Sequence, residues 1–276
     1  MKYNKAMLWM MVCSAFIIGC GKDEPTDNEQ LDSQVKQNGW YTSIDQTPRN
    51  DIPGTSKGDT SIPRDMWRIM GEGEINYDII VEKPNARIPL EFKWPDTLMV
   101  VYTDIPDTSI RDTIAKPAPY FNGTLTYYYR HEDGQWVFDK ITPIAVKSDS
   151  AHPYVKLDSI QVEVLGQGML PTIKDCTTPI PIENYPYTFN VGDTVRIKVF
   201  ESGTAPSNWV FLHAPVFDNV SEFDYDTVGG YWFGKWVTKA VGKHWAWVDL
   251  WDLDVIFEKD VTTERDELWG LPYIVE

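Results

Sequence analysis

The residues in this chain with the clearest chemical potential are four histidines and a large set of carboxylates. His131, His152, His213 and His244 stand in no H-E-x-x-H motif, and no C-x-x-C pair is present, so the usual zinc spacings are missing. The sequence also lacks the G-x-S-x-G of a nucleophile elbow and the glycine pattern of a phosphate-binding loop. We therefore predict no catalytic residue, no metal ligand and no cofactor, and we expect hydrogen-bonded or solvated histidines.

A second candidate is a set of aromatic residues near the C-terminal end. Trp245, Trp247 and Trp251 share one face of a predicted strand, and Asp249 lies between them. Exposed indole rings beside a carboxylate would suit a sugar, which offers apolar C–H faces and hydroxyl groups. The alternative is a hydrophobic core, because tryptophan buries a large area. The pattern leaves both interpretations open.

An acidic run forms a third candidate. Asp218, Glu222, Asp224 and Asp226 lie in a predicted loop, and oxygen-rich loops can hold Ca²⁺. The spacing of an EF-hand is not met, so a solvated charged loop is the competing interpretation.

The first twenty residues carry a different kind of chemistry. Lys2 and Lys5 form a positive head, and Ala6 to Ile18 is an apolar run broken only by Ser14. The run is too short to cross a hydrocarbon core of about 30 Å, so it indicates a cleaved export signal. The small residue Gly19 then precedes Cys20.

Ile17-Ile18-Gly19-Cys20 resembles the lipobox of bacterial lipoproteins. This resemblance implies cleavage before Cys20 and acylation of its thiol with palmitate-type chains, which anchor the protein to a membrane. Gly21-Lys22-Asp23-Glu24 is similar to the signal that sends Bacteroidetes-type lipoproteins to the outer face of the outer membrane. The expected location is therefore the cell surface rather than the periplasmic face.

Charge and cysteine content narrow the partners and the means of stabilisation. The net charge is −16, which disfavours nucleic acid as a partner. Once Cys13 is removed and Cys20 is acylated, only Cys176 remains, so no intramolecular disulfide can form. We expect Cys176 to be a small core residue.

The elements that must position these residues begin after a predicted tether. Residues 20–60 are rich in Asp, Glu, Gln, Ser, Thr and Pro, which indicates a flexible linker. As a coil, it would hold the folded part about 35 Å from the lipid.

Residues 61–147 are predicted to form a β-rich α+β module. Arg64–Met70 favours one or two helical turns, and Ile88–Trp94 and Leu98–Thr103 favour separate strands. Thr124–Arg130 and Gln135–Ile141 predict a hairpin across a four-residue loop. This hairpin resembles the last hairpin of cystatin-like or NTF2-like domains. Those folds also need an N-terminal helix, and the sequence shows only a weak signal for one.

Residues 153–276 are predicted to form a second module made of short strands. Thr194–Phe200 alternates strictly, which indicates a strand with one buried and one wet face. Regular turns and the lack of a helical period favour a β-sandwich, and the pattern resembles a bacterial Ig-like domain. The expected fold class is thus mainly β.

These observations favour a non-enzymatic binding or interaction module that is exported and lipid-anchored, with a protein or glycan partner. The alternatives are a glycan-binding surface lipoprotein that uses the Trp-rich strands, or a hydrolase. A hydrolase would need a cleft that gathers carboxylates, or His213 and His244.

The lipid anchor is directly testable. We expect labelled palmitate to enter the expressed protein and globomycin to block its processing, because both depend on the Cys20 thiol. Cys20→Ala should abolish labelling and release the protein from membranes. Unchanged processing under globomycin, or labelling of the alanine variant, would contradict the prediction.

Overall fold

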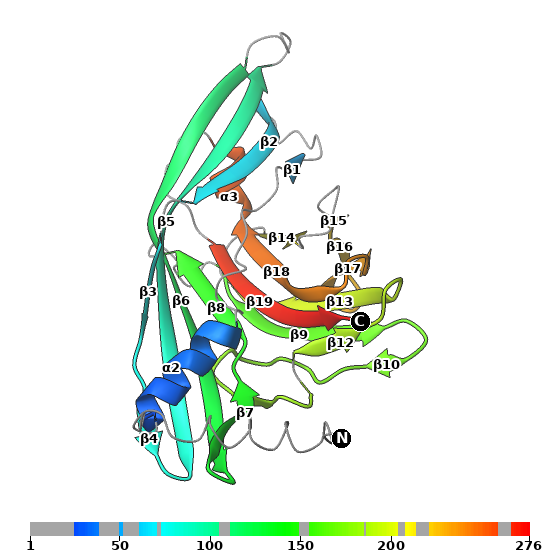
Figure 1. Cartoon of the computed structure of the whole chain (residues 1–276). Helices are drawn as coiled ribbons and strands as arrows, with labels where there is room; N and C mark the ends of the chain where they lie inside the picture. Colours follow the sequence, from blue (N-terminus) through cyan, green and yellow to red (C-terminus); the bar gives the residue numbers. More distant parts are fainter. Residues whose placement is uncertain are drawn as a thin grey trace, which may run out of the picture.

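The computed structural model describes residues 25–38, 50–51, 61–70, 73–104, 111–148, 155–184, 186–203, 208–213, 221–258 and 266–276. The fold is mainly β, as predicted (Figure 1). Within the described residues, one sheet contains 14 strands and a second contains five. None of the described helices is long and apolar enough to span a membrane.

The larger sheet follows the order β1-β2-β5-β6-β8-β19-β18-β14-β15. These strands are β1 (Asn50–Asp51), β2 (Ser61–Met70), β5 (Asn85–Asp104), β6 (Arg111–Glu132), β8 (Ile144–Ser148), β19 (Asp266–Val275), β18 (Gly242–Asp252), β14 (Asn208–His213) and β15 (Ser221–Glu222). Its side branches are β3 (Glu74–Tyr77), β4 (Ile80–Glu82), β7 (Gln135–Ile141), β11 (Ile180–Pro181) and β12 (Tyr187–Phe189).

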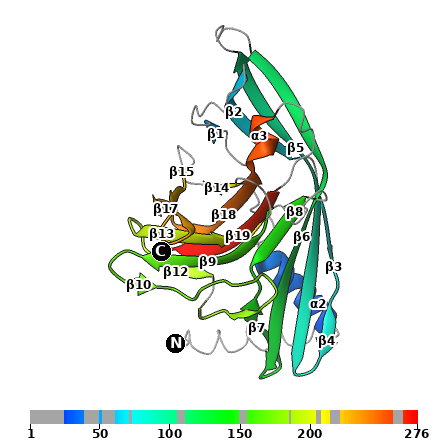
Figure 2. The same cartoon turned by 180° about the vertical axis from the view of Figure 1, so that it is seen from behind.

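Strands β5 and β6 form a long bent ribbon that runs the length of the molecule (Figures 1 and 2). The sequence predicted two strands where β5 is continuous, because Pro95 stands between them. The pairing with β6 shifts register between Trp94 and Asp96, so the proline occupies a bulge, where its missing N–H is tolerated. The helical turns expected for Arg64–Met70 are wrong, since β2 pairs with β5 through this segment.

The predicted tether contains a docked helix, α2 (Asp27–Asn38), which corrects part of the 20–60 prediction. Leu31 and Val35, one helical turn apart, are fully buried in the main core. The helix begins with a reciprocal cap: the Thr26 N–H donates to Glu29 Oε2 at 2.7 Å, and the Glu29 N–H donates to Thr26 Oγ1 at 3.3 Å. These two apolar residues therefore anchor an otherwise polar segment in the core.

Polar contacts fix the same helix to the lower end of the ribbon. Asp27 pairs with Lys83 at 2.8 Å and accepts a hydrogen bond from Trp136 Nε1 at 3.1 Å, and Tyr77 donates its hydroxyl to Asp32. The ammonium of Lys83, helped by the indole, holds the pKa of Asp27 below its ordinary value. These contacts therefore stabilise docking at neutral pH, and that stabilisation is lost as the pH falls through the lowered pKa.

The second sheet packs against the C-terminal half of the first. Its order is β10-β9-β13-β17-β16, formed by β10 (Gly168–Met169), β9 (Leu157–Val164), β13 (Thr194–Glu201), β17 (Tyr231–Val237) and β16 (Asp224–Asp226). Strand β13 alternates as predicted, with Val195, Ile197 and Val199 buried. Trp236 crosses the interface between the sheets to contact Tyr273, with ring centroids 6.1 Å apart.

The strand order of the five-stranded sheet, and of the β19-β18-β14-β15 part of the larger sheet, can be compared with that of a known type of sandwich. If β9, β13, β14, β15, β16, β17, β18 and β19 are lettered A, B, C, C′, D, E, F and G, the layers are A-B-E-D and G-F-C-C′. Immunoglobulin-type sandwiches place A, B, E and D in one sheet and G, F and C in the other. Strand β12 adds a short parallel pairing beside β19.

The boundary predicted between modules 61–147 and 153–276 does not separate two independent units. Strand β8 of the first half pairs with β19 of the second, for example at Val146–Leu268 and Ile144–Gly270. A single buried cluster also contains residues from both halves. The two predicted modules thus share one sheet and one core.

A smaller core closes the upper end. Helix α3 (Leu253–Phe257) packs with the upper part of β5, where Tyr102 donates its hydroxyl to the Ile256 carbonyl at 2.7 Å. The buried Lys116 ammonium donates to the carbonyls of Val255 and Glu258, the latter at 2.7 Å. These bonds satisfy carbonyls at the end of the helix that its own N–H groups leave unpaired.

Docking of α2 can be tested through Leu31. Leu31→Ala should lower the free energy of unfolding by about 2–5 kcal/mol, because it leaves a cavity in the main core. The measurement is urea denaturation of the mature protein. Leu165→Ala is the matched control, since Leu165 is 37% exposed in a turn, and its loss should be below about 0.5 kcal/mol. Equal effects of the two variants would mean that α2 does not dock.

Candidate binding site

The structure places the predicted tryptophan face inside the protein. Trp245, Trp247, Trp251 and Asp249 are 1%, 7%, 1% and 0% exposed. Strand β18 brings them onto one face, as expected, but both faces of the strand are covered from Trp245 onward. The hypothesis of an open stacking platform on this strand is thus corrected, since no sugar ring can reach buried indoles.

A glycine explains how two indoles fit side by side. The rings of Trp245 and Trp247 stack with centroids 5.4 Å apart and planes 22° apart. They lie over Gly270 of the neighbouring strand, where a Cβ atom would come within 2.7 Å of Trp247 and 3.1 Å of Trp245. The missing side chain makes the space that the rings fill, so this pair serves packing.

The other sequence candidates are dispersed. Cys20 and His152 lie outside the described residues, as does the side chain of His213. His244 Nε2 lies 2.8 Å from the Ala240 carbonyl, and the His131 ring packs edge-on against Trp136. Among the described residues, no group of three or more His, Cys, Asp or Glu is placed to hold a metal ion.

Asp226 of the acidic run and the remaining thiol, Cys176, have structural roles. Asp218 is not among the described residues, whereas Asp226 accepts hydrogen bonds from the N–H groups of Val228 and Gly229 and closes a turn. Cys176 is buried, as predicted. Burial raises the pKa of its thiol, and the carboxylates of Glu267 and Asp175 raise it further, which leaves a poor nucleophile.

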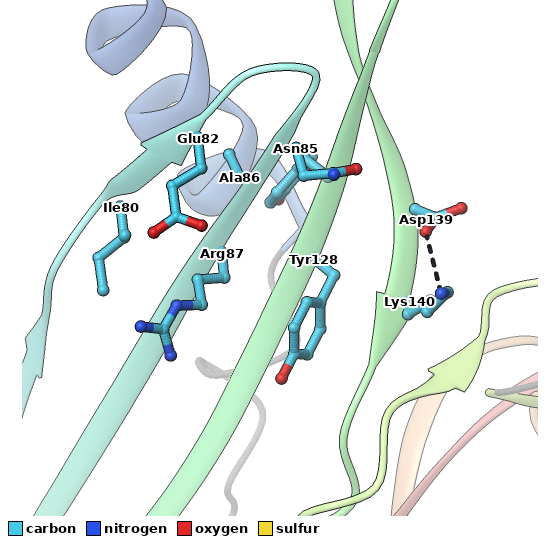
Figure 3. Close-up of a pocket in the computed structure, with 9 residues that line it drawn as sticks. Ile80, Glu82, Asn85, Ala86, Arg87, Tyr128, Asp139 and Lys140 are labelled. Atoms are coloured by element: carbon cyan, nitrogen blue, oxygen red, sulfur yellow. Dashed lines mark ion pairs between the residues drawn. The ribbon is translucent and has the colours of Figure 1, made fainter.

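The most promising site is a depression of about 330 Å³ on the lower ribbon, on strands β4 to β7 (Figure 3). Its volume is at the lower end of the range for small-molecule sites. The lining combines an aromatic ring, charges of both signs and an amide: Glu82, Asn85, Arg87, Tyr128, Asp139 and Lys140. Such a mixture is suited to a polar ligand that also has an apolar face.

Sheet register sets the arrangement of three of these side chains. Arg87 pairs with Tyr128 across β5 and β6, and Tyr128 pairs with Lys140 across β6 and β7. Directly opposed residues project to the same face, so the tyrosine stands between two cations. The ring of the neighbouring Tyr129 points to the opposite, buried face.

Ion pairs occupy one side of the depression. Asp139 lies 3.7 Å from Lys140 and 3.8 Å from Arg130, and Arg130 also pairs with Glu132 at 2.8 Å. In the part of the chain that is described, Arg87 has no carboxylate within 4.0 Å and the Tyr128 hydroxyl has no hydrogen-bond partner. The guanidinium and hydroxyl are therefore available to a ligand.

Sequence reasoning missed this site, although one signal was present. The alternation of Thr124–Arg130 assigns Leu125, Tyr127 and Tyr129 to one face and thereby assigns Tyr128 to the other. The partners on β5 and β7 depend on register, which the sequence alone did not provide. The chain matches no family model, no curated protein and no solved structure, so the site depends on its own geometry.

The packing role of the tryptophans can be tested at Gly270. Gly270→Ala should lower the free energy of unfolding by about 1–3 kcal/mol, because the added methyl group overlaps both indoles. Urea denaturation followed by tryptophan fluorescence measures this loss. An unchanged midpoint would show that the indoles can move away, as they could in an open groove.

Proposed function

We propose that this protein is an exported, lipid-anchored binding protein that acts without a catalytic step. The leader of residues 1–19, which directly precedes Cys20, supports the anchor. The depression on the lower ribbon carries the binding role, because it offers an arginine and a tyrosine hydroxyl without partners among the described residues. An Ig-type identity for the C-terminal sandwich belongs to the same proposal and is supported by its strand order.

The docked helix brings the site close to the membrane. Six residues separate Cys20 from Asp27, where α2 begins. A fully extended chain of that length reaches at most about 25 Å, whatever its conformation. Asp27 is tied to Lys83 at the turn between β4 and β5, so acylation of Cys20 would hold this end of the ribbon beside the bilayer.

A glycan is the ligand class that the lining favours. The tyrosine ring can pack against the C–H face of a sugar, while the carboxylates, amide and cations around it can bond to hydroxyl groups. The glycan alternative from the sequence thus moves from the buried β18 tryptophans to the surface of β5, β6 and β7. The tyrosine replaces them as the aromatic group.

The mature protein, purified in detergent, provides the test on a glycan array. We expect binding to at least one class of surface polysaccharide, and we expect mass analysis to show the bound glycan intact after incubation. Cleavage of the bound glycan would overturn the non-enzymatic proposal. If no glycan on the array binds, a glycan ligand is excluded and a protein becomes the proposed partner.

A further inference from the structure

We propose that the depression on β4 to β7 binds a carboxylated sugar, with Arg87 as the residue that recognises the carboxylate. The inference rests on the proposed binding function and names its ligand class. It comes from the row Arg87–Tyr128–Lys140, whose members are direct neighbours across three strands.

Arg87 is favoured over Lys140 and the nearby Arg130 because it has no ion-pair partner among the described residues. Lys140 shares Asp139 with Arg130, so both already face a carboxylate. Arg87 is exposed and has no such partner among the described residues. In a chain of net charge −16, an arginine that has no carboxylate within ion-pair distance among the described residues is a natural position for an anion from outside.

The geometry of the groups fits a carboxylate on a ring. A guanidinium presents two parallel N–H donors that match the two oxygens of a carboxylate. The Tyr128 hydroxyl stands next to it in register and can donate to the same group or to a ring hydroxyl. Glu82 and Asn85 line the same depression and can bond to further hydroxyls (Figure 3).

The charge balance favours a carboxylate over a phosphate. Glu82 and Asp139 place two negative charges beside the two positive charges of Arg87 and Lys140. Because repulsion scales with charge, a doubly charged phosphate would meet twice the repulsion from these carboxylates that a singly charged carboxylate meets. A carboxylate bound at Arg87 lies near Glu82 but on the side away from Asp139 (Figure 3). A uronic acid, which has one carboxylate and several hydroxyls, meets both requirements.

Isothermal titration of the mature protein with oligogalacturonate, and with a neutral galactan of the same length, tests the proposal. We expect binding of the carboxylated oligomer only. Arg87→Gln should weaken it roughly 10- to 100-fold, as expected for loss of a charged hydrogen-bond pair. Arg87→Lys keeps the positive charge but loses the paired N–H donors. Its affinity should therefore lie between that of the unmodified protein and that of Arg87→Gln.

Arg196→Gln is the matched control. Arg196 pairs with Glu163 at 3.2 Å on the other sheet, so its loss should leave the affinity for oligogalacturonate unchanged. Thermal unfolding of each variant shows whether the fold is retained, which we expect because Arg87 is exposed. Equal weakening by both glutamine variants would overturn the assignment to Arg87.

Two further outcomes separate this inference from the proposed function. Binding of neutral glycans that Arg87→Gln does not affect would overturn the carboxylate site but keep the binding function. If neither oligomer binds, the inference is overturned. If no glycan on the array binds either, the proposed glycan-binding function is also excluded. Titration with phosphatidylcholine vesicles that contain glucuronosyl diacylglycerol distinguishes a membrane-linked source of the carboxylate from a soluble one.

Discussion

The central strands β18 and β19 are buried on both faces, and the remainder of the fold is arranged to cover them. From Trp245 to Asp252 every residue of β18 is buried, and β19 is buried from Asp266 to Tyr273. One face packs against the five-stranded sheet, and part of the other packs against the upper half of β5 through Trp251 and Phe211. A sheet that is buried on both faces needs a layer on each side, which explains why the two halves of the chain share one core.

This constraint also explains what the sequence could and could not predict. Strand β13 and the β6–β7 hairpin were predictable because each has one wet face, so that polar and apolar residues alternate. The face that holds Trp245 and Trp247 was ambiguous, because the same apolar sequence is compatible with a ligand-binding surface and with a core. Helix α2 was missed because only Leu31 and Val35 mark its buried side. Its docking depends on Lys83 and Trp136, which lie far away in sequence.

The lower end of the ribbon carries the packing of α2 and the proposed binding depression on opposite faces of the same strands. Residues Tyr127 and Tyr129 point toward the core that α2 completes, whereas Tyr128 between them points into the depression. Because the side chains of a strand alternate, the packing that fixes the inner residues also fixes the backbone from which the outer residues project. A binding site on such strands is more rigid than one built from loops.

The pairing of β8 with β19 has a consequence for the order in which the chain can fold. Lys147 pairs with Glu267, about 120 residues later in the sequence, so the inner edge of the ribbon can be completed only after that later segment has been synthesised. Contacts between distant residues carry a large loop-closure cost, and topologies that depend on them form slowly. Until β19 arrives, β8 is an unpaired edge that can associate with other chains. Partly folded forms of this chain would therefore expose one edge of β8 until β19 docks against it.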